Sequence, residues 1–122
     1  MHTNKELDKW ISLVSVQDID SVVDLYEEEG LLLGTFSDEI RMGKEKIREY
    51  FKYFLAQKPK ASVVDSVTHM IGDDILVANG FYDFEVLDDI QDTKIVHARF
   101  TFVFKLKADS FTILSHHSSV MP

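Results

Sequence analysis

The segment from Lys94 to Lys107 alternates apolar and polar side chains every two residues, and this pattern most constrains the fold. A two-residue period places alternate side chains on opposite faces of a β-strand, so we expect one long strand here. One face would carry Val96, Ala98, Phe100, Phe102, Phe104 and Leu106. The other face would carry His97, Arg99, Thr101 and Val103.

Three more strands are expected around this segment, because β-branched and aromatic residues recur between short turn sequences. Consecutive strands joined by short turns pair in antiparallel fashion, so the second half of the chain predicts an antiparallel meander. The four expected strands are Ser62–Ile71, Ile75–Leu87, Lys94–Lys107 and Phe111–Val120. The expected connections are Gly72–Asp74, Asp88–Asp92 and Ala108–Ser110.

Three stripes of apolar residues at helical spacing predict amphipathic helices in the first half of the chain. The first stripe consists of Leu7, Trp10, Ile11 and Val14. The second consists of Ile19, Val22, Val23 and Tyr26, and the third of Ile47, Tyr50, Phe51 and Phe54. Each stripe needs another surface to cover it, and the sheet supplies that surface.

The ends of these helices are predicted from capping residues. Thr3 followed by Glu6 forms a capping-box pattern, so the first helix is expected to begin at about Thr3. Asp18 is the expected N-cap of the second helix, and Gly30 its expected stop. The third helix should end before the Lys58-Pro59 pair, since the residue before proline disfavours helical geometry.

The order of these elements predicts an α+β architecture in one domain spanning residues 1–122. Leu31–Thr35 is a further candidate for a short strand. We therefore expect an antiparallel sheet of four to five strands with three N-terminal helices on one face.

Composition excludes several classes of protein and site. The net charge of −8 disfavours binding to nucleic acid, and the chain has no cysteine for disulfides or thiolate ligands. It has no apolar run long enough to span a membrane, and its N-terminus does not resemble a signal peptide. We expect a cytoplasmic protein that binds neither membrane nor nucleic acid and needs no cofactor or metal.

The long strands carry large apolar side chains on both faces, as Phe81 beside Tyr82 illustrates. Six of the nine phenylalanines lie in the last three strands. Helices on one side leave the second face uncovered, and a second copy of the chain would cover it. The alternative is a strongly curved sheet in which the helices cover most of this apolar surface.

Arg99 lies in the middle of a strand, on the same face as His97 and Thr101. A guanidinium is costly to bury without a partner, so an inward Arg99 would need a carboxylate or an anionic ligand. The alternatives are an outward position at the rim of the sheet and an internal pair with an acid such as Asp24.

His116 and His117 are adjacent in an expected strand, so their side chains should point to opposite faces. They cannot then bind one metal ion together, and no further ligands occur at a recognisable spacing. One histidine should face the helices and the other should not; the sequence leaves open which.

Asp38 is a candidate general base. This role requires burial beside Tyr82 or His116, where apolar surroundings would raise the pKa of the carboxyl group. The alternative is a solvated turn at residues 37–39.

Several segments along the chain carry a family resemblance, and the C-terminal His-His-Ser-Ser-Val-Met-Pro of residues 116–122 is the most specific. The others are Val23–Tyr26, Leu32–Thr35, Arg41 with Gly43, Tyr50–Leu55, His69–Asp73 and Ala98–Phe104. Together they resemble the nuclear transport factor 2-like (cystatin-like, SnoaL-like) superfamily. Within it, the chain is similar to a bacterial family related to the association domain of calcium/calmodulin-dependent protein kinase II.

This resemblance implies a cone-shaped fold, in which a curved sheet wraps around three helices and encloses a central pocket. Superfamily members commonly dimerise through the open face of the sheet, and the kinase domain is a non-catalytic hub that assembles into rings. Its pocket is lined by arginines; Arg99 has the strand position and parity of one, whereas Tyr82 stands near another. Asp38 lies roughly where the related ketosteroid isomerases place their base.

We therefore predict a non-catalytic association-type domain that forms a homodimer or larger ring and binds a small anionic or polar-aromatic ligand. The expected ligand-binding residues are Tyr26, Tyr82, Arg99, His116 and His117. The alternative is a cofactor-free isomerase, polyketide-cyclase-like enzyme or hydrolase. Its candidate acid–base residues are Asp38, His116 and His117.

Overall fold

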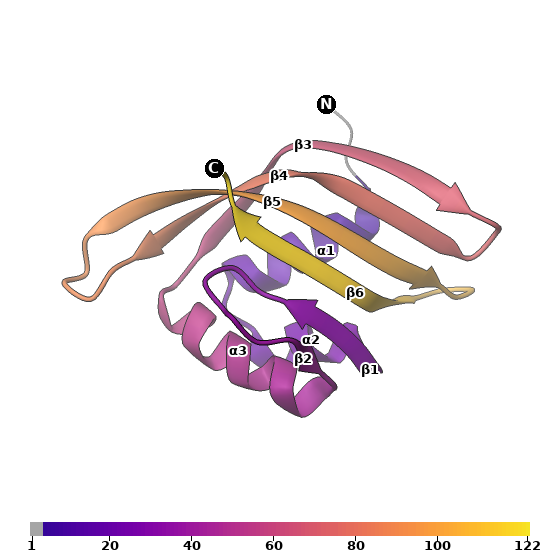
Figure 1. Cartoon of the computed structure of the whole chain (residues 1–122), viewed down its shortest axis with the longest axis horizontal. Coiled ribbons are helices and arrows are strands. Elements are labelled where there is room, and N and C mark those ends of the chain that lie inside the picture. The colour runs from indigo at the N-terminus through magenta and orange to yellow at the C-terminus, as the bar shows by residue number, and fades with distance from the viewer. Residues whose placement is uncertain (1–3) are drawn as a thin grey trace.

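Six strands form one curved sheet with three helices against one face, in the computed structural model that describes residues 4–122 (Figure 1). The helices are α1 (Lys5–Ser15), α2 (Ile19–Asp24) and α3 (Lys44–Ala56). The strands are β1 (Tyr26–Leu33), β2 (Arg41–Met42), β3 (Lys60–Ile71), β4 (Ile75–Leu87), β5 (Thr93–Leu106) and β6 (Phe111–Val120). The α+β prediction is confirmed, with six strands in place of four to five.

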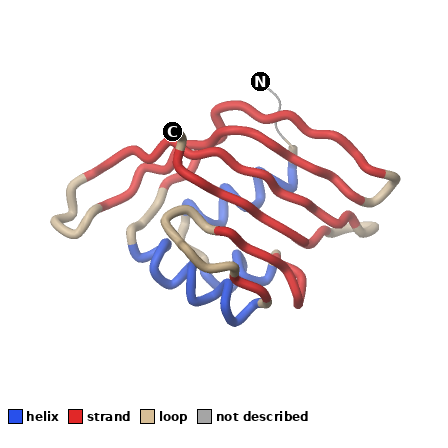
Figure 2. Tube along the Cα trace, viewed as in Figure 1, coloured by secondary structure: helices blue, strands red, loops and turns tan. Residues whose placement is uncertain are grey.

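The strand order in the sheet is β2-β1-β6-β5-β4-β3. The last four strands form the predicted antiparallel meander, while β1 runs parallel to the C-terminal strand β6. This pairing places Leu32 opposite His116 and Leu33 opposite His117. Figure 2 shows all three helices on the same side of the sheet. We call that side the inner face and the opposite side the outer face.

Of the predicted helix boundaries, the start of the first helix falls outside the described residues, and the end of the second was wrong. Helix α1 begins at Lys5, because Asn4 is its N-cap and accepts a hydrogen bond from the Leu7 amide at 2.7 Å; Thr3 lies outside the described residues. Asp18 caps α2 as predicted, but this helix ends at Asp24 and not at Gly30. The following residues form β1, since pairing with β6 satisfies their backbone and overrides the helical stripe.

Two β-bulges decide which side chains reach each face. In β3, Val63 pairs with Tyr82 and Asp65 with Phe81, so Val64 is the extra residue. A bulge reverses the alternation that follows it, and Asp65 therefore points to the outer face. The backbone of Asp65 also comes so close to Gly80 that a Cβ there would lie 2.1 Å from the Asp65 carbonyl oxygen.

The second bulge lies in β6, where Phe104 of β5 pairs with Ile113 and Val103 pairs with Ser115. Leu114 is the extra residue of this bulge. Ile113 is buried in the core, so the reversal places the next buried position at His116. Neighbouring His117 points to the outer face.

The hydrophobic core lies between the helices and the inner face of the sheet. Trp10 of α1 is its central side chain, 1% exposed and in ring contact with Phe51, Tyr82 and Phe102. The apolar set predicted for β5 points here, from Val96 to Phe104, as its alternation required. The inner face is therefore the packed side of the molecule.

Candidate functional site

The five predicted ligand-binding residues lie on two sides of the sheet and do not form one site. Tyr26, Tyr82 and His116 point to the inner face and are at most 2% exposed. Arg99 and His117 are exposed and line a hollow on the outer face.

A chain of hydrogen bonds links the three inner residues. Trp10 Nε1 donates to the Tyr26 hydroxyl at 3.1 Å, and this hydroxyl lies 2.8 Å from His116 Nδ1. The other ring nitrogen, His116 Nε2, lies 3.1 Å from the Tyr82 hydroxyl. Each polar atom of this set is buried and has a partner, which offsets the cost of removing it from water.

Two small residues extend the chain, and sequence reasoning did not assign them a place in the site. The Tyr82 hydroxyl donates to Ser118 Oγ at 2.5 Å, and Ser118 Oγ lies 2.5 Å from Thr35 Oγ1. Thr35 follows β1 and Ser118 belongs to β6, so the parallel pairing of these strands brings the two hydroxyls together. We call the set of Trp10, Tyr26, Tyr82, His116, Ser118 and Thr35 the inner network.

The directions of these hydrogen bonds fix the tautomer of His116. Tyr82 gives its only hydroxyl proton to Ser118, so its oxygen accepts from His116 Nε2–H. Nδ1 is then unprotonated and accepts from Tyr26, whose oxygen in turn accepts from Trp10. One neutral tautomer satisfies every bond of the inner network.

Burial also favours the neutral form of this histidine. It lowers the pKa of His116 from 6.5 to about 3, with a smaller contribution from the nearby His117. Burial likewise raises the pKa values of the Tyr26 and Tyr82 hydroxyls well above their usual value. The inner network is therefore uncharged at neutral pH.

Aromatic rings pack around the inner network on several sides. Phe102 stacks on the His116 ring with 3.8 Å between centroids, and Trp10 stacks on Tyr82 at 5.7 Å. The network is thus part of the packed core in this structure. It joins α1, β1, β4 and β6 by hydrogen bonds between their side chains.

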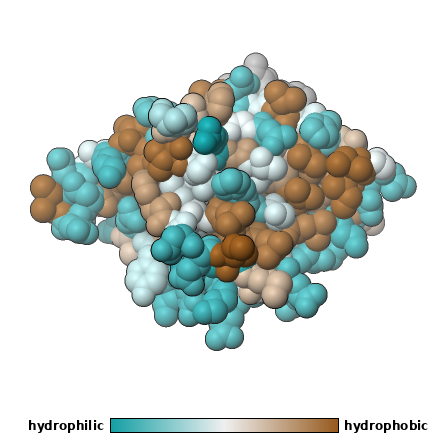
Figure 3. All heavy atoms as spheres, viewed as in Figure 1, coloured by the Kyte–Doolittle hydropathy of each residue, from teal (hydrophilic) through white to brown (hydrophobic). Residues whose placement is uncertain are grey.

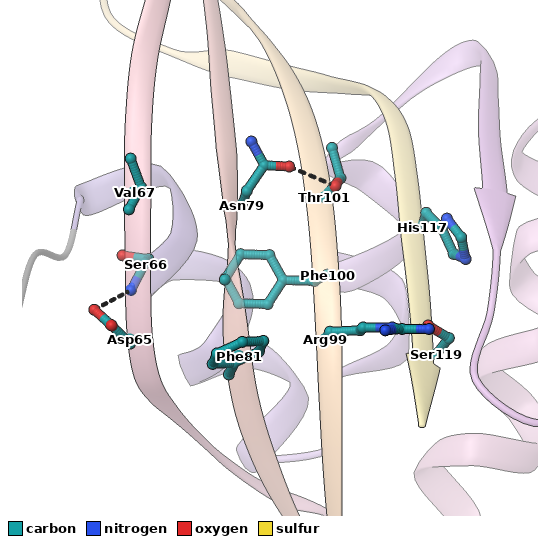
Figure 4. Close-up of a pocket in the computed structure, with 11 residues that line it drawn as sticks. Asp65, Ser66, Val67, Asn79, Phe81, Arg99, Phe100, Thr101, His117 and Ser119 are labelled. Atoms are coloured by element: carbon teal, nitrogen blue, oxygen red, sulfur yellow. Dashed lines mark hydrogen bonds between the residues drawn. The ribbon is translucent and has the colours of Figure 1, made fainter. Parts of the chain in front are cut away.

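The outer face contains a hollow of about 500 Å³ formed over strands β3 to β6 (Figure 4). Arg99, Phe81, Asp65 and His117 are among the residues that line it. Arg99 Nε donates to Ser119 Oγ at 3.3 Å, and within residues 4–122 no carboxylate forms an ion pair with Arg99. This arginine is therefore the outward one of the alternatives considered.

Large apolar side chains flank this hollow on the same face. Phe81 remains 44% exposed and Val67 66% exposed, and Leu33 of β1 pairs with His117 of β6. Figure 3 shows hydrophobic patches over the strands on the viewed side of the molecule. The helices leave these side chains uncovered, which argues against the alternative that sheet curvature would bury them.

Asp38 lies in the loop between β1 and β2 and is exposed. It lines a smaller hollow of about 250 Å³ together with Arg41 and Tyr50. Within the described part of the chain, it forms no hydrogen bond with His116 or Tyr82. The geometry corresponds to the solvated turn that was the alternative for this segment.

His116 and His117 point to opposite faces, as the alternation predicted. Across residues 4–122, no group of three or more histidine, aspartate and glutamate side chains is arranged to hold a metal ion. No helix within the same range is long and apolar enough to cross a membrane.

The model of the calcium/calmodulin-dependent protein kinase II association domain matches residues 3–122. The chain belongs to this association-domain family. A solved structure from Xanthomonas campestris that carries the same domain name is 36% identical, with a TM-score of 0.90, and covers 95% of this chain and 83% of its own. No match was found among curated proteins.

More distant solved structures share the fold of this association domain. A kinase II hub homology domain from Chlamydomonas reinhardtii is 14% identical at a TM-score of 0.74, covering 96% of this chain and 94% of its own. A ketosteroid isomerase-like protein from Erwinia carotovora is 12% identical at 0.79, covering 96% and 92%. An NTF2-like protein with a cystatin-like fold from Novosphingobium aromaticivorans is 10% identical at a TM-score of 0.76, covering 96% of this chain and 78% of its own. The fold is therefore the cystatin-like, nuclear transport factor 2-like architecture, and the family match makes this an association-type domain.

Proposed function

We propose that this association domain forms homo-oligomers and that two copies associate through the outer face of the sheet. The observation that carries the proposal is the exposure of Phe81, Val67, Leu31 and Leu33 on that one face. Apolar side chains gathered on one surface favour association, because contact removes them from water. Family membership supports the same role.

The measurement that tests this proposal is the native mass by light scattering at two protein concentrations. The wild-type chain should have the mass of a dimer or larger assembly at both. Phe81→Asp should shift the mass toward the monomer, since it places a charge in the apolar contact. Tyr53→Asp is the matched control, because Tyr53 is 74% exposed on helix α3, away from the outer face, and should leave the mass unchanged. A monomeric wild-type protein would contradict the proposal.

The small-molecule site expected from the sequence stays a prediction. Arg99 and His117 in the outer hollow favour an anionic or polar-aromatic ligand, because a guanidinium binds carboxylates and phosphates. The other three expected residues belong to the inner network and are buried. The enzymatic alternative also stays untested, and the exposed position of Asp38 gives it no support.

A further inference from the structure

Four residues of the outer face lie in one row across four strands. The pairing of neighbouring strands places Asp65 opposite Phe81, Phe81 opposite Arg99, and Arg99 opposite Ser119. Because neighbouring strands are about 4.8 Å apart, Asp65 and Arg99 stand about 10 Å apart with the Phe81 ring between them. Figure 4 shows this order, with Arg99 directed toward Ser119 and away from Asp65.

Neither charge of this row has a counter-charge among residues 4–122 of its own chain. Asp65 Oδ1 accepts a hydrogen bond from the Ser66 amide at 2.9 Å, and Arg99 donates to Ser119. Among the described residues, neither side chain takes part in an ion pair. The row therefore presents one negative and one positive charge at equal distances from an apolar residue.

This arrangement is complementary to itself under one particular symmetry. A two-fold axis that runs parallel to the strands and passes over Phe81 exchanges the positions of Asp65 and Arg99 between two copies. We propose that two copies of the chain pair about this axis, with Asp65 of each copy facing Arg99 of the other. The proposal rests on the proposed self-association through the outer face and specifies its geometry.

Other placements of the axis leave the charges worse matched. An axis over β5 brings Arg99 against Arg99, and an axis across the strands along this row brings each charge against its own copy. An axis between β4 and β5 sets Arg99 against Phe81 and Asp65 against Ser119, so neither charge is neutralised. Like charges brought together at an interface weaken binding, whereas opposite charges fix the register.

The neighbouring row is compatible with the same axis. It consists of Val67, Asn79, Thr101 and His117. The axis over β4 places Val67 opposite Thr101 of the other copy and Asn79 opposite Asn79, contacts that bring no charges of the same sign together. Asp83 and Glu85, the next outer-face residues of β4, also lie under this axis and would face their own copies. The hydrogen bond between Asp83 and His97 of β5, at 2.7 Å, directs the Asp83 carboxylate toward β5 and away from the axis.

The test uses two charge-reversal variants, Asp65→Arg and Arg99→Asp. Each variant alone would place like charges at both symmetric contacts, so its dimer dissociation constant should rise roughly tenfold or more. An equimolar mixture of the two should recover a dimer of wild-type affinity, because both contacts of the mixed dimer are again between opposite charges. Sedimentation or light scattering over a concentration series measures this, and circular dichroism checks that each variant is folded.

A matched control keeps the two proposals separable. Asp73→Arg, in the exposed turn between β3 and β4, keeps Asp65 and Arg99 and should dimerise on its own like the wild type. Its mixed dimer with Arg99→Asp should not reach wild-type affinity, because one of the two contacts is still between like charges. The double variant Asp65→Arg/Arg99→Asp should dimerise like the wild type and provides a second reading. A wild-type dimer that the single reversals do not weaken, or that the mixture does not restore, overturns the pairing and leaves self-association standing. A wild-type monomer overturns both.

Discussion

His116 and His117 are consecutive in the chain, yet one is 2% exposed among aromatic rings and the other lines a hollow on the opposite face. Every polar atom of the inner network has a partner within the chain, and the network holds no charge at neutral pH. On the outer face, Asp65 and Arg99 have no counter-charge within the part of the chain that the structure describes. The comparison shows that the inner face has used its polar groups within the fold. The outer face keeps two charged groups, Asp65 and Arg99, available to a second molecule.

The largest effect that separates the two faces is expected from Trp10→Ala. This substitution removes a ring that contacts Phe51, Tyr82 and His116, and it should lower the free energy of unfolding by about 3–5 kcal/mol. Tyr53→Ala, an equally aromatic deletion at an exposed site, should change it by less than about 0.5 kcal/mol. Urea unfolding followed by circular dichroism, at one fixed protein concentration, measures both. Equal losses would show that the inner face is not the packed side.

A smaller effect is expected when one hydroxyl is deleted from the inner network. Tyr82→Phe leaves His116 Nε2–H without an acceptor and Ser118 without a donor, so stability should fall by about 1–3 kcal/mol. Tyr53→Phe is the control and should be neutral. Were Tyr82→Phe also neutral in the same unfolding assay, the hydrogen bonds of this network would contribute nothing net to stability.

The smallest effect is a pH dependence that belongs to His116. Its pKa is lowered to about 3 in the folded chain, so the unfolded chain takes up a proton first as the pH falls below about 6.5. The contribution of His116 to the free energy of unfolding therefore has its full value above about pH 6.5. The free energy of unfolding should be about 1.4 kcal/mol lower at pH 5.5 than at pH 7.5.

Two variants assign this slope to one residue. His116→Gln should remove that part of the pH dependence, whereas His117→Gln on the exposed face should retain it. Urea unfolding at pH 7.5, 6.5 and 5.5 compares the three proteins. A slope that survives in His116→Gln would place its origin in other titrating groups.

Periodicity predicted the meander, the faces of β5 and the opposite orientation of the two histidines, because these follow from alternation alone. It failed at Tyr26, where a helical stripe continued into residues that pair with the distant strand β6. It also left open which histidine is buried, since the bulge at Leu114 reverses the alternation and no local pattern announces it. Thr35 and Ser118 were not assigned to the site, because their contact depends on the parallel pairing of β1 with β6, which the sequence pattern did not predict.

The two bulges also determine where strands β3 and β6 tolerate a change in length. Val64 and Leu114 are each the unpaired extra residue of a strand, so deleting either codon would restore a regular ladder and leave every other side chain on its present face. An insertion elsewhere in these strands would exchange core and surface residues unless a new bulge absorbed it. Within β3 and β6, length variation among relatives of this domain should therefore concentrate at these two positions.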